Sequence, residues 1–403
     1  MKILKQICKA FIGIMGLILL LELVIYAWAP IYDFPEPVLF QGDSIYNPYR
    51  DVDSTSWKKA NFHFHSRAWL GLTSGSKNSY KTFYDTYKML GYDAPQISNY
   101  QMIDNHFKDS SFYIPTYEHG FGIRKKHHIL IGTTKVLWFD YSIIQNRHHK
   151  QHILDLLRND NDIVAIAHPD WEKGFSLNDM KYLTNYNLIE VLNNNWRSFL
   201  QWDEALSSGH LAYILANDDA HDIENVYGVG MCCTFINTPN STTTEMISAL
   251  KDGKAYGAEI DINFGDTYET KTKEAKKLPF VKLVEVKDDT LFVETTGIAF
   301  KFTFIGQNGS IRKITRYTNR AWYRIQPEDT YIRTSIRFFN YKNEPGTTLY
   351  LNPVFRTIDG TIPETRKPKV NSLKTNIFRT FSLAGILLVI VILLKRKNSY
   401  LCF

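Results

Sequence analysis

The hydrophobic pattern of the chain begins with an apolar run over residues 10–30, in which Glu22 is the only charged side chain. The run is long enough to cross the hydrocarbon core of a bilayer, which needs about 20 residues. Lysines precede it, and the tyrosine and tryptophan side chains near its far end are typical of a membrane interface. The pattern predicts an uncleaved signal anchor over residues 1–32, and a cleaved signal peptide is the alternative.

A second apolar run, over residues 381–394, lies near the other end of the chain and is followed by three basic residues. It is short for a membrane span unless it extends back past Arg379, whose long side chain can reach the interface. We predict a transmembrane helix over residues 376–397, with a buried C-terminal helix as the alternative. Because basic ends tend to stay in the cytoplasm, we expect an integral protein of the bacterial inner membrane with an extracytoplasmic, periplasmic body.

Between these runs, residues 56–258 alternate short apolar stretches with stretches whose apolar residues recur at helical spacing. The predicted strands include residues 162–167, 187–192 and 210–216, and the predicted helices include residues 81–90 and 149–158. Strands separated by helices favour a parallel sheet or a barrel, and a barrel carries its functional groups at the carboxyl ends of its strands.

Residues 259–365 have a different pattern, in which apolar and polar residues alternate as they do along half-buried strands. The predicted strands are residues 280–286, 290–294, 300–305, 330–338 and 348–351. This pattern predicts a small all-β sandwich after the α/β region. The predicted fold is therefore an α/β unit followed by an all-β unit, between two transmembrane helices.

Composition mainly argues against some classes of partner and site. The length of 403 residues suits two domains, and 44% hydrophobic with 22% charged residues is ordinary for a globular body. The net charge of +6 is modest and its excess lies near the termini, which fits membrane flanks and argues against a nucleic-acid partner. The four cysteines, of which Cys232 and Cys233 are adjacent, form neither a disulfide framework nor a thiolate zinc site.

Candidate chemistry starts at His63 and His65, which stand one residue apart in Asn61-Phe62-His63-Phe64-His65. On a strand the two rings share one face, and Phe62 and Phe64 turn to the other face, toward a core. Neutral imidazole is a common metal ligand near pH 7, so two rings on one strand form half of a coordination sphere. A half-buried strand without a metal is the simpler interpretation of a lone His-x-His motif.

The rest of the chain supplies further potential ligands in order. Each stands at or near the end of a predicted strand, where a barrel places its functional groups. They are Glu118, the pair His127 and His128, His168, Asp219 and His221. Singly, each has a structural explanation such as a turn or a helix cap, but the ordered set is much less expected by chance.

This ordered set resembles the polymerase-and-histidinol-phosphatase (PHP) family over about residues 58–258. The resemblance implies a distorted (β/α)7 barrel that holds divalent metals. It implies that one metal is bound by His63, His65, Glu118 and Asp219. Glu118 would bridge to a second metal that is held by His168 and by either His127 or His128. The spacing to Gly132 favours His127.

The chain departs from the family pattern at the position of a third metal. Asn99 and Tyr100 stand where the family has Asp and His, and Ser74 stands where it has Asp. These changes leave His221 as the only obvious ligand there. We therefore expect two divalent ions, zinc, manganese or iron, since mixed histidine and carboxylate ligands suit these metals.

A bridged metal pair would lower the pKa of a shared water and hold the oxygens of a phosphoryl group. Glu118 and Asp219 are the predicted catalytic residues, and Arg67, Arg197 and Tyr100 are candidates for binding a substrate phosphate. The two arginines also have the simpler interpretation of surface or ion-paired residues.

The sequence thus predicts a membrane-anchored, metal-dependent phosphoesterase of the PHP type that acts on a small phosphorylated substrate. Hydrolysis of another ester or an amide is the alternative among enzymes, because a metal pair does not dictate phosphorus chemistry. The alternative outside enzymes is a catalytically inactive barrel that is tethered to the membrane and binds glycan or a partner. The lipid bilayer is an expected partner, and the sequence names no protein partner.

Overall fold

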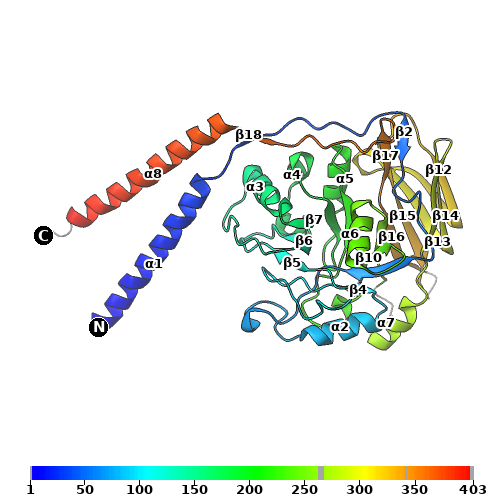
Figure 1. The fold of residues 1–403 in the computed structure, drawn as a ribbon, viewed down its shortest axis with the longest axis horizontal. Helices are drawn as coiled ribbons and strands as arrows, with labels where there is room; N and C mark the ends of the chain where they lie inside the picture. Colours follow the sequence, from blue (N-terminus) through cyan, green and yellow to red (C-terminus); the bar gives the residue numbers. More distant parts are fainter. Residues whose placement is uncertain (1, 262–266, 341–343, 400–403) are drawn as a thin grey trace.

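The structure is a computed structural model that describes residues 2–261, 267–340 and 344–399. It is a mixed α/β protein, as the hydrophobic pattern predicts, and an apolar helix lies at each end of the chain (Figure 1). Residues 262–266 and 341–343, which fall within the predicted all-β region, lie outside the described residues.

One sheet of five strands carries most of the candidate ligands. Its order is β5-β6-β7-β8-β9, in which β6 is antiparallel to both neighbours and β7, β8 and β9 are parallel. The strands are β5 (Thr116–His119), β6 (His128–Thr133), β7 (Asn161–Ile166), β8 (Leu188–Leu192) and β9 (Tyr213–Ala216). Their side chains are almost all buried, which explains why they appear in the sequence as short continuous apolar stretches.

A second sheet has eleven strands and runs through both predicted domains. Its path is β12-β13-β15-β16-β11-β10-β3-β4, and β14, β17 and β2 pair to the side of this path. The strands of the α/β region are β3 (Trp57–Asn61), β4 (Ala94–Pro95), β10 (Cys232–Asn237) and β11 (Ala255–Glu259). The others are β2 (Ser44–Tyr46), β12 (Val281–Lys287), β13 (Thr290–Gly306), β14 (Ser310–Arg324), β15 (Tyr331–Phe339), β16 (Pro345–Leu351) and β17 (Val354–Thr357).

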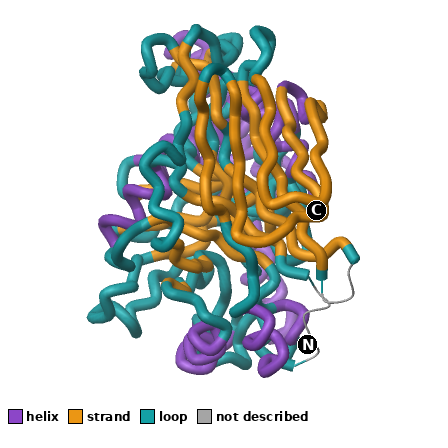
Figure 2. The backbone as a smooth tube through the Cα atoms, turned by 90° about the vertical axis from the view of Figure 1, so that its right-hand side faces the viewer, coloured by secondary structure: helices purple, strands orange, loops and turns teal. Residues whose placement is uncertain are grey.

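The strands of the predicted all-β region are long and antiparallel (Figure 2). The predicted strands 290–294 and 300–305 are one strand, β13, with an irregular register between Glu294 and Ala299. Because β16 pairs with β11, these strands continue the sheet of the α/β region. The predicted boundary after residue 258 falls inside β11 and stays a prediction.

The distorted (β/α)7 barrel implied by the family resemblance is not shown by the strand pairing of the described residues. Among the described residues, the β-bridges between the two sheets are the isolated pairs Phe64↔Ala220 and Tyr100↔Glu118. The strand β6 also runs against its neighbours. The antiparallel direction of β6 has a physical reason. The connection from β5 to β6 covers only residues 120–127, which is shorter than the dozen or so residues that a parallel crossover needs.

Helices cover the sheets, and most begin at a side chain that caps the first turn. Ser79, Asn146 and Thr242 accept backbone N–H groups at the starts of α2, α3 and α6. Helix α3 packs on β7, α5 on β8, and α6 on β10. The helices of the body are α2 (Tyr80–Met89), α3 (Arg147–Arg158), α4 (Leu177–Tyr182), α5 (Phe199–Ser207), α6 (Thr243–Lys251) and α7 (Tyr268–Ala275).

The terminal helices α1 (Lys2–Ala27) and α8 (Ser372–Ser399) leave the body from the same side (Figure 1). Each contains a stretch that is long and apolar enough to cross a membrane, Ile3–Ala27 in α1 and Ser372–Leu393 in α8. Almost no residue in these stretches is buried. Two short strands, β1 (Tyr32–Asp33) and β18 (Lys369–Val370), pair where the helices meet the body. This antiparallel pairing holds the two ends of the chain together, although they are more than 300 residues apart in sequence.

Candidate metal centre

The candidate ligands gather at one edge of the five-stranded sheet, beside the segment that follows β3. Glu118 lies in β5, His168 follows β7, and Asp219 follows β9. His127 precedes β6 but reaches the same edge, because β6 runs antiparallel to β5 and β7. Gly120 permits the turn between β5 and β6: its φ is +127°, and a Cβ atom there would lie 2.7 Å from Cδ2 of His127.

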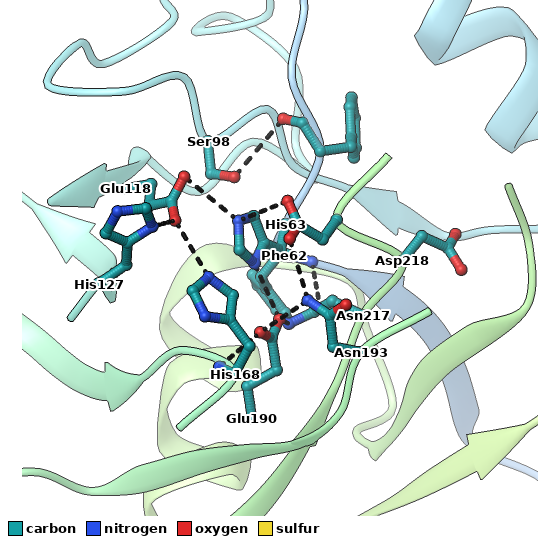
Figure 3. Close-up of polar contacts among 12 residues, drawn as sticks. Phe62, His63, Ser98, Glu118, His127, His168, Glu190, Asn193, Asn217 and Asp218 are labelled. Atoms are coloured by element: carbon teal, nitrogen blue, oxygen red, sulfur yellow. Dashed lines mark hydrogen bonds and ion pairs between the residues drawn. The ribbon is translucent and has the colours of Figure 1, made fainter. Parts of the chain in front are cut away.

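The Glu118 carboxylate lies at the centre of the cluster, and its two oxygens face different histidines (Figure 3). Oε2 lies 3.4 Å from Nε2 of His63 and 3.2 Å from Nε2 of His65. Oε1 lies 2.5 Å from Nδ1 of His127 and 3.4 Å from Nε2 of His168. One carboxylate therefore separates two pairs of imidazole rings.

Asp219 faces the first of these pairs from the other side. Its Oδ1 lies 3.1 Å from Nε2 of His63, 3.3 Å from Nε2 of His65 and 3.2 Å from Nε2 of His221. The rings of His65 and His221 stack with their centroids 4.3 Å apart. The side chain of His221 is 30% exposed, whereas that of Asp219 is 2% exposed. The cluster therefore reaches the surface at His221.

The geometry of these atoms suits a cation better than hydrogen bonds within the cluster. The buried atoms Nε2 of His63, Oε2 of Glu118 and Oδ1 of Asp219 have no hydrogen-bond partner, and an unsatisfied buried polar group costs about 1–3 kcal/mol. Two sets of ligand atoms each lie within 4.8 Å of one another: those of His63, Glu118 and His168, and those of His63, His65 and Asp219. Imidazole nitrogens together with carboxylate oxygens fit zinc, manganese or iron.

Glu190, in β8, holds the ring of His63 in place. Its Oε1 lies 2.9 Å from Nδ1 of His63, which leaves Nε2 of that ring directed at the cluster. Asn217 and Asn193 donate to the same carboxylate at 2.8 Å and 3.2 Å, and Asn193 also donates to Oδ2 of Asp219 at 3.1 Å (Figure 3). The backbone N–H of His168 donates to Glu190 at 3.0 Å. One buried carboxylate thus positions two candidate ligands.

Two candidate ligands have a strained backbone. His168 has a φ of 29° and Asp219 has a φ of 51°, in the left-handed region that residues with a side chain rarely adopt. Such a conformation costs of order 1–3 kcal/mol and persists where the surroundings hold it. Here the N–H of Asp219 donates to the carbonyl of His63 at 2.8 Å, which helps to hold it. The strain coincides with the residues that point into the cluster.

The two central carboxylates are anionic in this arrangement. Burial raises the pKa of Glu118, but its interactions with His127, His63 and His168 outweigh burial and hold that pKa well below its usual range. Burial likewise raises the pKa of Asp219, but its interactions with His63, His221 and His65 hold that pKa well below its usual range. Anionic carboxylates are the form that binds a divalent cation.

Three of the predicted site residues lie outside the cluster. His128 packs against His119 and Phe175, with ring centroids 5.7 Å and 5.6 Å away, because it faces away from its neighbour His127. Arg197 is ion-paired with Glu259 at 2.7 Å and also donates to backbone carbonyls, so it is not free to hold a phosphate. Arg67 is exposed.

Tyr100 lies over the cluster, at the position where the family resemblance expects a histidine. Its ring stacks on His65 with a centroid distance of 4.4 Å, and burial raises its pKa above the usual value. Its hydroxyl is hydrogen-bonded to Ser74. Two of the three positions that depart from the family pattern, Ser74 and Tyr100, therefore contact each other.

Sequence reasoning missed the supporting residues Asn193, Asn217 and Asp218. Asp218 lies next to Asp219 but points away from the cluster (Figure 3), where it accepts the N–H groups of Gly230, Met231 and Cys232 at 2.7–2.8 Å. Its neighbour Asn217 reaches Glu190 instead. The run of polar residues after a buried strand indicated that functional side chains lie there. Which of these side chains points into the cluster and which points away could not be assigned without the fold.

Comparison with known proteins adds little to this geometry. No protein-family model and no curated protein matches the chain. One solved structure, from Bacteroides vulgatus, is described as a two-domain protein containing a predicted PHP-like metal-dependent phosphoesterase. It is 14% identical, its alignment covers 77% of this chain and 99% of that chain, and the TM-score is 0.37. At this level the similarity establishes neither family nor activity.

Proposed function

We propose that the protein is a membrane-anchored, metal-dependent hydrolase, and more specifically a phosphoesterase of the PHP type. The observation that carries the proposal is the carboxylate of Glu118, whose two oxygens face separate pairs of histidines at 2.5–3.4 Å. A carboxylate placed in this way suits a pair of divalent cations.

The cluster divides into two proposed ligand sets that share Glu118. The ligands of the first ion would be His63, His65, Glu118 and Asp219. Those of the second would be Glu118, His127 and His168. When bound, the metal pair would supply a shared water of lowered pKa and positive charge for the phosphoryl oxygens.

Protein groups around the ions have their own proposed roles. Glu118 and Asp219 supply the negative charge that offsets two dications, and Glu190 fixes the tautomer of His63. His221 and Tyr100 border the opening of the cluster and would meet an incoming substrate. The hydroxyl of Tyr100 is the nearest candidate for orienting that substrate.

The fold assignment belongs to the same proposal. Strands β3 and β4 pair in parallel, and the isolated bridges Tyr100↔Glu118 and Phe64↔Ala220 lead from them to β5 and to the segment after β9. With β6, β7 and β8 between β5 and β9, the order of these seven segments supports a ring. We infer a distorted PHP-type barrel in which the ring is closed by single bridges and not by ladders.

The variant Glu118→Gln tests the proposal. Glutamine keeps the size of the side chain but removes the charge that both ions need, so the purified full-length protein should lose both metals and all phosphoester hydrolysis. His128→Gln, one strand away and outside the cluster, is the matched control and should keep both. A folded Glu118→Gln protein that keeps its metal and its activity would exclude the metal centre.

A screen of phosphomonoesters and phosphodiesters separates the proposal from its alternatives. A protein that binds metal but cleaves only carboxylic esters or amides would be a hydrolase of another class. A protein that cleaves none of them would favour an inactive barrel that binds a partner. Asn99 and Tyr100 are the residues that support this second candidate, because they depart from the family pattern and Asn99 is hydrogen-bonded to Ser66.

The extracytoplasmic, periplasmic position of the body is also a proposal. It is supported by the basic residues that flank the apolar ends of the chain. Reporter fusions near Ser56 and Asp359 should report the extracytoplasmic side. A fusion after Phe403, which lies outside the described residues, should report the cytoplasm. Cytoplasmic signals from the two internal fusions would reverse the topology.

A further inference from the structure

Exposed apolar side chains lie on three chain segments, residues 69–72, 121–123 and 138–144, near the cluster. Leu70 and Leu72 are 94% and 88% exposed, and Ile123 and Ile144 are 72% and 70% exposed. Together with neighbouring aromatic residues they form what we call the apolar rim. The rim consists of Trp69, Leu70, Leu72, Phe121, Ile123, Trp138, Ile143 and Ile144. Contiguous exposed apolar groups of this kind mark a surface that contacts a membrane or a partner.

The apolar rim is connected directly to the candidate metal centre. The indole N–H of Trp69 donates to the carbonyl of Tyr100 at 2.8 Å, and the ring of Tyr100 stacks on His65. Trp69 also contacts Trp138, with ring centroids 5.7 Å apart. Residues 120–124 follow β5 and are joined to the next rim segment, where the N–H of Ile123 donates to the carbonyl of Ser142 at 2.8 Å. The rim therefore adjoins the cluster.

The rim is also continuous with the first membrane-spanning helix candidate. The hydroxyl of Tyr26, in the last turn of α1, accepts the N–H groups of Ile143 and Ile144, each at 2.8 Å. The ring of Tyr26 lies edge-on to Tyr141 at 5.3 Å. In Figure 1 the loop before α3 lies on the side of the body from which α1 leaves. If α1 spans a bilayer, these contacts hold the rim at the level of the lipid headgroups.

The backbone holds part of the rim in an exposed, strained conformation. Trp69 and Leu70 have φ values of 49° and 56°, which bulky residues rarely adopt. Strain of this kind is typical of segments that bind a ligand. Arg124 is exposed next to Ile123, and Arg67 is exposed close to Trp69, so positive charge lies beside the apolar side chains. Apolar groups flanked by basic residues match the interface of an anionic bilayer.

We propose that the apolar rim inserts into the lipid interface and that the cluster hydrolyses a phosphoester carried by a membrane lipid. The choice of substrate rests on the proposed phosphoesterase function, whereas the insertion of the rim does not. In the reaction the oxygen of one water forms the new bond to phosphorus, the bond to the ester oxygen breaks, and a proton of that water passes to the leaving oxygen. A lipid substrate explains why leucine, isoleucine and tryptophan side chains are exposed beside a polar site.

The first experiment compares one headgroup in two physical states. The full-length protein, reconstituted with metal in vesicles, is given long-chain phosphatidic acid or phosphatidylglycerol in the bilayer, and the dihexanoyl forms of the same lipids in solution. In Leu70→Asp/Leu72→Asp the ratio of bilayer to soluble rates should fall by about tenfold or more, because the charged side chains resist insertion. Ile298→Asp, at a 64% exposed position on β13, is the matched control and should leave the ratio unchanged. An unchanged ratio in the double variant, or an equal fall in the control, would overturn the proposal.

The second experiment needs no activity. Brominated lipids quench tryptophan fluorescence at the depth of the bromine, so Trp138→Phe should remove part of the quenching that the full-length protein shows. Trp322→Phe, at a 52% exposed position on β14, should remove none. If Trp138→Phe changes nothing, the rim does not insert, and a protein partner is the better occupant. If quenching behaves as expected but neither form of any lipid is cleaved, the insertion stands and the phosphoesterase function is wrong.

Discussion

Oε1 of Glu190 lies 2.9 Å from Nδ1 of His63, on the side of the ring that faces away from the candidate metal centre. When the ring is neutral, this pair favours the tautomer in which Nδ1–H donates to the carboxylate and the lone pair of Nε2 faces the cluster. Glu190 thus orients the ring of His63 for binding a metal.

Glu190→Gln is predicted to weaken metal binding without removing a ligand. The amide keeps the size of the side chain but loses the charge that makes His63 a stronger donor, and such changes cost about 10–100-fold in metal affinity. Titration of the metal-free protein with zinc or manganese measures the change. Glu285→Gln, the same change at an exposed position of β12, should leave the affinity as it is. Equal affinities of the Glu190 variant and the parent would assign Glu190 a purely structural role.

His127 and His128 provide a matched pair, because they are adjacent and only one faces Glu118. His127→Gln should lower the metal content by about one ion per chain, since one of the two proposed sites loses a ligand. His128→Gln should keep the metal content and instead lower the melting temperature, because a buried ring that packs against Phe175 is replaced. Elemental analysis of both variants shows which histidine is the metal ligand. Metal loss in the His128 variant alone would reverse the assignment.

Metal binding is predicted to stabilise the fold. The cluster holds two anionic carboxylates close together, and a bound cation offsets their repulsion. A ligand at one hundred times its dissociation constant adds about 2.7 kcal/mol to the free energy of unfolding. Chelation should therefore lower the melting temperature, and elemental analysis before chelation should find about two ions per chain. A stoichiometry of three would show that a ligand of a further site has been missed, and His106 would be the first candidate.

Tyr100→Phe separates the two contributions of this side chain. Phenylalanine keeps the ring on His65 and removes only the hydroxyl that is bonded to Ser74. If the tyrosine only fills space, kcat/KM should stay within about threefold of the parent. A loss of about 100-fold with unchanged metal content would instead give the hydroxyl a role in orienting substrate or water.

The junction between α1 and the body should be sensitive to acid. Burial lowers the pKa of His149 to about 4, helped by the charges of His148 and His152, and its ring stacks on Tyr141 at 4.3 Å. Because the unfolded chain binds this proton near pH 6.5, the contribution of His149 to stability is complete above that pH and is lost as the pH falls toward 4.

The test of this junction compares His149→Gln with the parent over pH 7.5 to 5. Glutamine can keep the capping contact with the backbone N–H of Asn146 but does not titrate. The melting temperature of the variant should therefore fall less steeply than that of the parent, with both proteins measured without metal. Parallel curves would show that His149 does not control the pH dependence.

The hydrophobic pattern predicted the elements that lie in continuous apolar stretches. Strands β7, β8 and β9 and helices α2 and α3 lie within three residues of their expected bounds. Burial on both faces of a sheet, or on one face of a helix, produces a characteristic pattern of apolar residues. This pattern is the same whichever element packs against the buried face. The hydrophobic pattern does not reveal the register break between Glu294 and Ala299 or the direction of β6.

The sequence by itself determined which potential ligands and apolar segments the chain contains. They are His63 and His65 one residue apart, further potential ligands after apolar strands, and apolar ends long enough for membrane spans. Those features are local, because residue type and spacing suffice to define them. Only the tertiary structure decided that Glu118 lies between two pairs of histidines, that His127 and not His128 faces it, and that Glu190 lies behind His63. Glu118 and His127 are only nine positions apart, but Glu118 and His168 are 50 apart and His63 and Glu190 are 127 apart. These contacts therefore depend on how the strands are ordered and directed, which no local spacing records.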